Sequence, residues 1–169
     1  MQETKLAWLA GVIDGEGCIG IFRKTVKHRS GNVTTVPTPY ITIVNSSQAL
    51  MSECKSILDG LGISMYGLHY SRNETHRPLK RFLIKNHESL EILLDAILPY
   101  LVGKKDQGVL LREYLSKYGG KKGLEEERLT YFFGLQELKQ SDRLTPWRLD
   151  AGRESDGIGL FHEVGDQIS

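Results

Sequence analysis

The feature that most constrains the fold is a run of small residues near the N-terminus that ends in two acids. Ala7, Gly11 and Gly15 recur every four residues, so in a helix they share one nearly flat face. Glycine inside a helix is less favourable than alanine by about 0.5–1 kcal/mol, and a second helix packed closely on this face is the simplest compensation. Asp14 and Glu16 would lie at the C-terminal end of the helix, where the macrodipole disfavours anions. A divalent cation would remove that penalty, because carboxylate oxygens and free backbone carbonyls suit Mg²⁺.

Two copies of such a helix, packed through the small residues, would set two carboxylate sites side by side. That arrangement suits metal-assisted hydrolysis of two phosphodiesters. The alternative is a helix that stops at a polar, glycine-rich turn with Asp14 and Glu16 solvated, and a bare Asp-x-Glu near glycines favours this reading. The complete string from Leu9 to Gly17, between an amphipathic helix start and a strand, favours the first reading.

The rest of the chain predicts alternating helices and β-hairpins. Thr4 is the expected N-cap of the first helix, and the strands alternate Ile19 with Ile21 and Ile41 with Ile43 on one face. Helices are expected over 4–13, after Asn45-Ser46-Ser47, after Asn86, and over 104–118 and 124–139; strands are expected over 18–26, 36–44, 63–70 and 79–85. Pro37 and Pro39 indicate a sheet edge or a distorted strand start. This order predicts an α+β fold, in which helices cover one face of a four-stranded antiparallel sheet.

The length and the hydrophobic periodicity divide the chain in two. We expect one domain over residues 1–140 and a C-terminal extension of uncertain structure over 141–169, where the periodicity fails and glycines are scattered among charges.

The net charge of +1 hides an uneven distribution. Residues 19–51 hold no Asp or Glu, residues 60–87 hold Glu74 alone, and the acids gather later in the chain. A basic surface attracts polyanions, although solvated basic loops without a partner would give the same pattern. No apolar run approaches the ~20 residues of a membrane span, and the N-terminus lacks a secretory pattern. Two cysteines suggest neither a disulfide framework nor a zinc cluster. We expect an intracellular protein, cytoplasmic or organellar, with no membrane partner.

The string Leu9-Ala10-Gly11-Val12-Ile13-Asp14-Gly15-Glu16-Gly17 resembles the signature of the LAGLIDADG homing endonucleases. The predicted order of elements matches that family's αββαββα core with C-terminal helices, over residues 3 to about 139. One copy of the motif is present, and single-copy members of the family are homodimers. The resemblance therefore implies an intron-encoded, site-specific endonuclease that makes a staggered break in a long pseudo-palindromic double-stranded DNA site. It further implies two or three Mg²⁺ ions per dimer and a dimer interface at Ala7, Gly11 and Gly15.

The resemblance also implies roles for single residues. Glu16 takes the place of the metal-binding acid, although many members have Asp there, and the carbonyl of Gly15 also faces the metal. Asp14 takes a more structural position at the helix end. Asn45 falls where the family places a polar residue that organises water, and its alternative is a cap or turn residue. Lys104 falls where the family keeps a basic residue near the scissile phosphate, with Lys105 as its rival.

The family lays its sheet into the DNA major groove, which admits a two-stranded ribbon. The expected DNA contacts are the outward-facing Phe22, Lys24, Tyr40, Thr42 and Arg81, and, near the turn of the second hairpin, Arg72, Arg77 and Lys80. An arginine or lysine can bind guanine edges or phosphates, and the sequence does not separate the two.

Two other functions are compatible with the resemblance. Some members are maturases, which bind RNA and assist intron splicing, and a DNA-binding regulator could keep the fold without catalysis. Retention of Glu16 beside glycines favours the nuclease over both.

Overall fold

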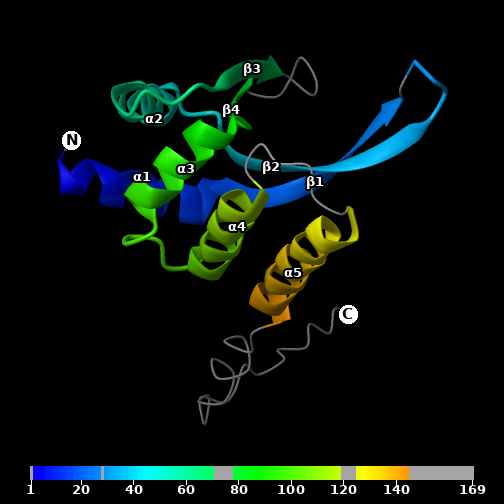
Figure 1. Ribbon diagram of the computed structural model, residues 1–169. Helices are drawn as coiled ribbons and strands as arrows, with labels where there is room; N and C mark the ends of the chain where they lie inside the picture. Colours follow the sequence, from blue (N-terminus) through cyan, green and yellow to red (C-terminus); the bar gives the residue numbers. More distant parts are fainter. Residues whose placement is uncertain (1, 28, 71–77, 119–124, 145–169) are drawn as a thin grey trace, which may run out of the picture.

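The computed structural model describes residues 2–27, 29–70, 78–118 and 125–144. The elements follow the predicted order of helix, hairpin, helix, hairpin and helices (Figure 1). They are α1 (Glu3–Glu16), β1 (Gly17–Lys27), β2 (Val33–Asn45), α2 (Gln48–Gly60), β3 (Tyr66–Tyr70), β4 (Leu79–Ile84), α3 (His87–Ile97), α4 (Lys105–Tyr118) and α5 (Glu125–Leu144). The predicted α+β class is confirmed. In the part of the chain that is described, no helix is both long and apolar enough to cross a membrane.

The four strands form one antiparallel sheet in the order β1-β2-β4-β3. Ile41 at its centre pairs with Ile19 on β1 and with Ile84 on β4. Directly paired residues share a face of the sheet, so these isoleucines, with Ile21 and Ile43, make one continuous apolar surface, and all of them are buried as predicted.

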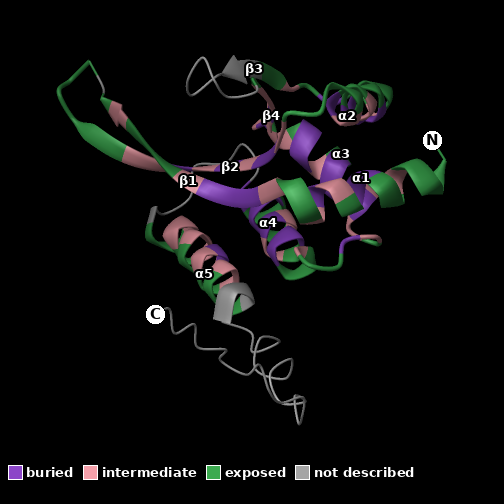
Figure 2. Ribbon diagram, turned by 180° about the vertical axis from the view of Figure 1, so that it is seen from behind, coloured by how far each residue is buried: buried purple, intermediate pink, exposed green. Residues whose placement is uncertain are grey.

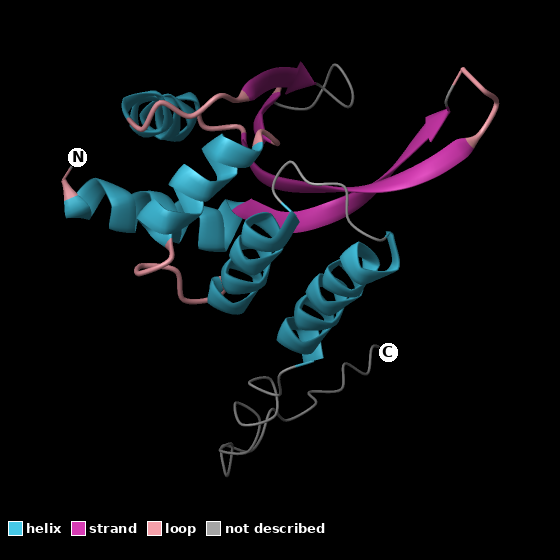
Figure 3. Ribbon diagram, viewed as in Figure 1, coloured by secondary structure: helices cyan, strands magenta, loops and turns pink. Residues whose placement is uncertain are grey.

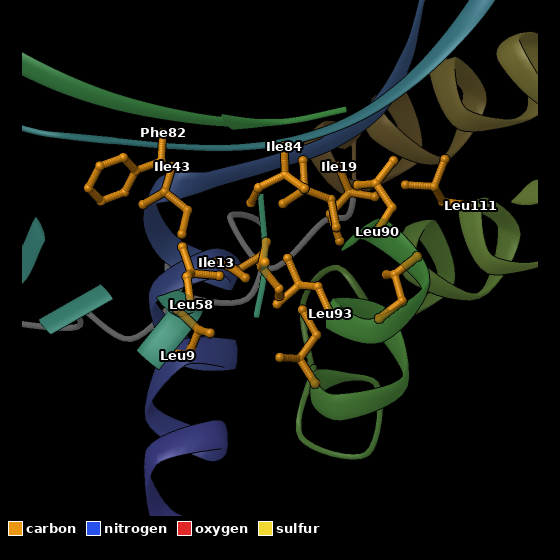
Figure 4. Close-up of a cluster of buried hydrophobic side chains, with 14 of the residues drawn as sticks. Leu9, Ile13, Ile19, Ile43, Leu58, Phe82, Ile84, Leu90, Leu93 and Leu111 are labelled. Atoms are coloured by element: carbon orange, nitrogen blue, oxygen red, sulfur yellow. The ribbon is translucent and has the colours of Figure 1, made fainter. Parts of the chain in front are cut away.

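The core lies between this surface and the helices. Figure 4 shows Ile19, Ile43 and Ile84 directed toward side chains of α1, α2 and α3, among them Ile13 and Leu93. Helices α1, α3 and α4 lie along the same side of the sheet (Figure 3). On the opposite face of the strands Lys139 of α5 contacts Cys18, whereas Lys24 farther along β1 is exposed.

The two prolines of β2 lie where that strand has a neighbour on one side. Pro37 and Pro39 pair with Arg23 and Ile21 of β1, whereas the pairing with β4 begins at Ile41. A proline has no N–H to give to a second neighbour, so the edge that the prolines predicted is present in this half of β2.

The first helix differs from the prediction at both ends. It begins at Glu3 with Gln2 as N-cap and no capping side chain, so Thr4 lies in the first turn and is not the cap. It also continues to Glu16, three residues past the expected end. The chain then passes directly into β1, because the N–H of Gly17 donates to the carbonyl of Ile13 while the backbone of Gly17 is already extended. A Cβ at Gly17 would lie 2.6 Å from the Ile13 carbonyl oxygen, so a side chain does not fit at this junction.

Capping side chains are present where the sequence placed the starts of α2 and α3. Ser47 accepts a hydrogen bond from the N–H of Leu50 at 3.3 Å, and Asn86 accepts one from the N–H of Ser89 at 3.1 Å. Helix α5 extends to Leu144, five residues beyond the predicted end at Lys139. The rest of the predicted extension, from residue 145 on, lies outside the described residues, so the division at 140/141 stays a prediction.

Candidate metal and nucleic-acid site

Glu16 is the last residue of α1, and its side chain is exposed. Its carboxylate makes no hydrogen bond or ion pair with any residue that the structure describes. Its neighbour Gly15 lies in the last turn of α1. Its carbonyl group has no N–H partner within the helix, because the residue four positions later already belongs to β1. The described residues of one chain hold no group of three or more His, Cys, Asp or Glu that could bind a metal. A cation at Glu16 would therefore need further oxygen ligands from outside this set.

The other acid of the motif is engaged within the chain. The carboxylate of Asp14 accepts hydrogen bonds from the backbone N–H groups of Val102 and Lys104, both at 2.8 Å. These bonds fix the loop before α4 against the end of α1. They leave Glu16 as the acid of the motif that is free to bind a ligand.

Lys104 lies at the same end of α1. In addition to its backbone bond, its ammonium group donates to the carbonyl oxygen of Asp14. A cation is favourable at the C-terminal end of a helix, where the macrodipole is negative. Lys105, its rival from the sequence, is the first residue of α4 and has an exposed side chain. The loop contacts thus bring Lys104 to the end of the helix that carries Glu16.

Asn45 closes β2 at the end of the sheet where α1 joins it. It lies two residues beyond Ile43, the partner of Gly17. Its side-chain oxygen accepts the N–H of Ser47 at 2.7 Å, which shapes the turn into α2. The turn accounts for this oxygen, and the role of Asn45 toward water stays a prediction.

The small residues of α1 face away from the rest of the chain. Ala7, Gly11 and Gly15 are exposed, and Figure 2 shows exposed segments along α1. A Cβ built at Gly11 or Gly15 would meet no described atom within 4 Å, in contrast to Gly17 at the end of the same helix. Packing within the chain therefore does not explain why these two positions are glycine.

Five of the predicted DNA contacts share the sheet face opposite the core. Phe22, Lys24, Tyr40 and Thr42 alternate with the buried isoleucines, and Arg81 pairs with Val44 on the same face. The Phe22 and Tyr40 rings lie 5.6 Å apart between centroids. The Arg81 Nε donates to the Thr42 hydroxyl at 3.1 Å, and that hydroxyl donates to the Phe82 carbonyl at 2.8 Å. Thr42 is buried, in contrast to the outward exposure predicted from the sequence, and its hydroxyl holds the Arg81 side chain in one geometry.

Lys80, another predicted contact, is not brought together with this group. Lys80 follows the alternation of Phe82, so it lies on the helix-covered side, with its ammonium group 5.7 Å from the Phe82 ring centroid. It lies opposite Asn45 in the register. Arg72 and Arg77 fall outside the described residues.

Two further residues on the sheet face opposite the core, Tyr66 and Lys85, were not predicted as DNA contacts from the sequence. Tyr66 of β3 pairs with Leu83, which places it on the Arg81 side, and its side chain is 60% exposed. The Lys85 ammonium group lies 4.7 Å from its ring centroid. An exposed aromatic residue beside a lysine suits nucleic acid, but the face of Tyr66 follows only from the strand register.

Tyr40 is the titratable group of this face whose pKa is displaced most clearly. Burial raises the pKa of the Tyr40 hydroxyl well above its usual range, and the hydrogen bond to Cys18, at 3.4 Å, acts in the same direction. Tyr40 is therefore a neutral phenol at physiological pH and adds no negative charge to the face.

Comparisons with known proteins agree with the fold. The family model of the LAGLIDADG-like domain matches residues 3–97, whereas no curated protein sequence matches the chain. The homing endonuclease I-CvuI, solved in complex with the I-CreI target, is 24% identical with a TM-score of 0.58, over 80% of this chain and 82% of that one.

Two other solved structures share the fold at lower identity. The archaeal intron-encoded homing endonuclease I-Vdi141I, complexed with DNA, is 19% identical with a TM-score of 0.59, over 83% of this chain and 85% of that one. The DNA-bound meganuclease I-SmaMI is 19% identical with a TM-score of 0.60, over 78% of this chain and 43% of that one. Since the family model covers more than half of the sequence and the folds agree, the chain belongs to the LAGLIDADG family.

Proposed function

We propose that this protein is an intron-encoded, site-specific DNA endonuclease that acts as a homodimer. In this proposal it cuts both strands of a long, pseudo-palindromic DNA site with the help of divalent metal. The observation that carries the proposal is Glu16, an exposed acid without a partner among the described residues, at the end of a helix whose small-residue face is uncovered.

The dimer is proposed to form through α1. A flat helical face lets two helices approach until their backbones nearly touch, and Ala7, Gly11 and Gly15 supply such a face. A two-fold interface uses the same patch on both subunits, so the two Glu16 residues would lie close together, one for each DNA strand. The absence of any described atom near a Cβ at Gly11 or Gly15 supports this assignment.

The metal site is proposed to use the Glu16 carboxylate and the Gly15 carbonyl. Both are hard oxygen ligands, and Mg²⁺ in proteins takes one or two carboxylates together with substrate phosphates and water. Two or three ions per dimer would complete the pair of sites. A bound ion would supply Lewis-acid stabilisation and a water of lowered pKa.

The remaining residues of the site are proposed to orient the substrate. The Lys104 ammonium group, beside the Asp14 carbonyl, would offset charge that develops on the phosphate. Asn45 would order water near the same helix end. The predicted DNA contacts on the sheet face opposite the core, together with Arg72 and Arg77 outside the described residues, would bind the major groove and the phosphates.

The test compares wild type with Glu16→Gln in the presence and absence of Mg²⁺. The substrate is a plasmid library of randomised near-palindromes, and cut ends are recovered by sequencing. Wild type is expected to cut a defined set of sites with Mg²⁺, and Glu16→Gln is expected to bind the same sites without cutting. The matched control is Glu3→Gln, an exposed acid at the opposite end of the same helix, which should cut like wild type.

Two outcomes would overturn the proposal in different ways. If Glu16→Gln cuts normally, the assignment of the metal-binding acid is wrong. If wild type cuts no DNA but binds RNA tightly, the maturase alternative replaces the nuclease.

A further inference from the structure

Lys139 of α5 reaches back to the start of β1, 121 residues earlier in the chain. Its ammonium group donates to the sulfur of Cys18 at 3.4 Å and lies 6.0 Å from the centroid of the Tyr40 ring. Cys18 is two residues beyond Glu16. The residues matched by the family model end at position 97, so α5 lies outside the matched segment.

A glycine makes room for this lysine. Gly20 is buried, and a Cβ at this position would lie 2.9 Å from the Lys139 nitrogen and 3.0 Å from the Tyr40 hydroxyl oxygen. A Cβ at Gly20 would also lie 3.0 Å from the Tyr40 Cε1 atom. The space left free by Gly20 is therefore filled by the Lys139 ammonium group and the hydroxyl edge of the Tyr40 ring.

The Lys139 charge lacks a counter-charge in the described part of the chain. No carboxylate of these residues forms an ion pair with it, and its hydrogen-bond partner is a thiol, which is a weak acceptor. The side chain is partly buried. A partly buried cation without an anionic partner is unfavourable, so an anion from outside the chain would stabilise this arrangement.

The position of the cluster indicates which anion this is. Cys18, Gly20 and Tyr40 alternate with Ile19, Ile21 and Ile41, so they lie on the sheet face that also carries Phe22, Lys24 and Arg81. Two residues of extended chain span roughly 7 Å, and nucleotides of one DNA strand are about 3.4 Å apart along the helix axis. A group at Cys18 is therefore one or two nucleotide steps from a phosphate at Glu16.

We propose that Lys139 binds a backbone phosphate of the DNA, one or two nucleotides from the bond that is cleaved at Glu16. This inference rests on the proposed endonuclease function. It makes α5 part of the DNA-binding surface and gives Gly20 a role, since a side chain there would displace the ammonium group. A lysine acts as a point charge and carries no sequence information at a phosphate, so the interaction would contribute to affinity and register for any DNA sequence.

The experiment measures the salt dependence of DNA binding, which depends directly on the number of phosphates that the protein neutralises. Lys139→Met removes the charge and keeps most of the side-chain length, and it is tested in the Glu16→Gln background on a mixed-sequence DNA duplex. The slope of log affinity against log salt should become shallower by about 0.9 for each phosphate that is no longer neutralised, with an unchanged melting temperature. Lys55→Met, an exposed lysine of α2 paired with Asp59, is the matched control and should keep the wild-type slope.

A second variant tests the geometry without removing the charge. Gly20→Ala should push the ammonium group aside and give the same shallower slope, and combining it with Lys139→Met should add little. Lys139→Arg should keep the wild-type slope.

The possible failures are separable. If Lys139→Met keeps the wild-type slope while wild type binds and cuts DNA, the role of Lys139 is wrong and the endonuclease stands. If wild type binds no duplex, the proposed function fails, and the inference fails with it.

Discussion

Two hydrogen bonds join Asp14 and Lys104, which are 90 positions apart in the sequence. The Lys104 backbone N–H donates to the Asp14 carboxylate at 2.8 Å, and the Lys104 ammonium group donates to the Asp14 carbonyl oxygen. One acid of the motif thus holds the loop that delivers a cation to the end of α1, while the other acid stays exposed. The positions of the candidate metal acid and of the candidate phosphate-binding lysine are therefore coupled through Asp14.

Removal of the Asp14 carboxylate should destabilise the protein. In Asp14→Ala the N–H groups of Val102 and Lys104 lose their acceptor, and hydrogen bonds to charged groups contribute about 1.5–3 kcal/mol each at most. Because the site is partly exposed, we expect a loss of about 1–3 kcal/mol in the free energy of unfolding, measured by urea denaturation. The control is Asp59→Ala, which removes an exposed ion pair with Lys55 and should change stability by less than about 0.5 kcal/mol. Equal effects in the two variants would contradict a structural role for Asp14.

Lys104→Met should impair cleavage far more than DNA binding. Loss of one preorganised group that stabilises developing charge typically lowers the rate by about 10²–10³-fold. Loss of the cation at the helix end should also reduce stability by about 0.3–1 kcal/mol. The measurement is single-turnover cleavage at saturating protein, with Lys105→Met as the matched control. If Lys105→Met is the slower variant, the choice between the two lysines must be reversed.

Gly11→Ala should stabilise the separate chain and weaken the dimer. A Cβ at Gly11 meets no described atom, and alanine is the better helix former by about 0.5–1 kcal/mol. In a dimer built on this face the same methyl group would separate the two helices. Light scattering over a range of concentrations should detect weaker association together with slower cleavage, and unfolding at high dilution should detect the gain in stability.

Gly17→Ala is the contrasting variant for this experiment. Its Cβ would lie 2.6 Å from the Ile13 carbonyl oxygen and 2.8 Å from the Ile13 Cα, so it should destabilise the chain itself by about 1–3 kcal/mol. Unchanged association and unchanged cleavage in Gly11→Ala would rule out the proposed interface.

Cys54 should make stability depend on alkaline pH. Burial raises the pKa of the Cys54 thiol to about 11, from the ordinary value of 9.0. The folded protein holds this proton more tightly than the unfolded chain does. Its contribution is therefore complete below pH ~9 and is lost as the pH rises toward ~11, at up to about 1.4 kcal/mol per pH unit.

The measurement is the free energy of unfolding as a function of alkaline pH, compared between wild type and Cys54→Ala. The variant should be less stable near neutral pH because it leaves a cavity, yet its stability should fall less steeply with alkaline pH. Parallel pH profiles would show that the Cys54 thiol does not titrate as expected. In the native protein, thiol reagents should modify the half-buried Cys18 well before the buried Cys54.

Local patterns in the sequence were sufficient for the architecture. Alternation with a period of two identified the buried face at Ile19, Ile21, Ile41 and Ile43, and the caps at Ser47 and Asn86 marked two helix starts. These signals act between residues close in the chain, so they can be recognised without knowing which segments meet. The motif of α1 likewise identified the family, because its small residues and acids lie within a few turns of one helix. The ends of α1 and α5 were predicted less well: the Gly17–Ile13 hydrogen bond extends α1 beyond its local signals, and α5 continues to Leu144.

The tertiary structure decided how side chains from distant segments combine. Strand register put Lys80 beside Phe82 and Arg81 beside Thr42, although the two basic residues are neighbours in sequence. The loop held by Asp14 brought Lys104 to the end of α1, and α5 brought Lys139 to Cys18. Such contacts depend on the simultaneous placement of several elements around one core, and no periodicity within a single segment contains that information. The sequence by itself therefore determined the fold, the family and the candidates Glu16 and Lys104, whereas the placement of Lys104 at the Asp14 carbonyl and of Lys139 at Cys18 was determined by the packing of the chain.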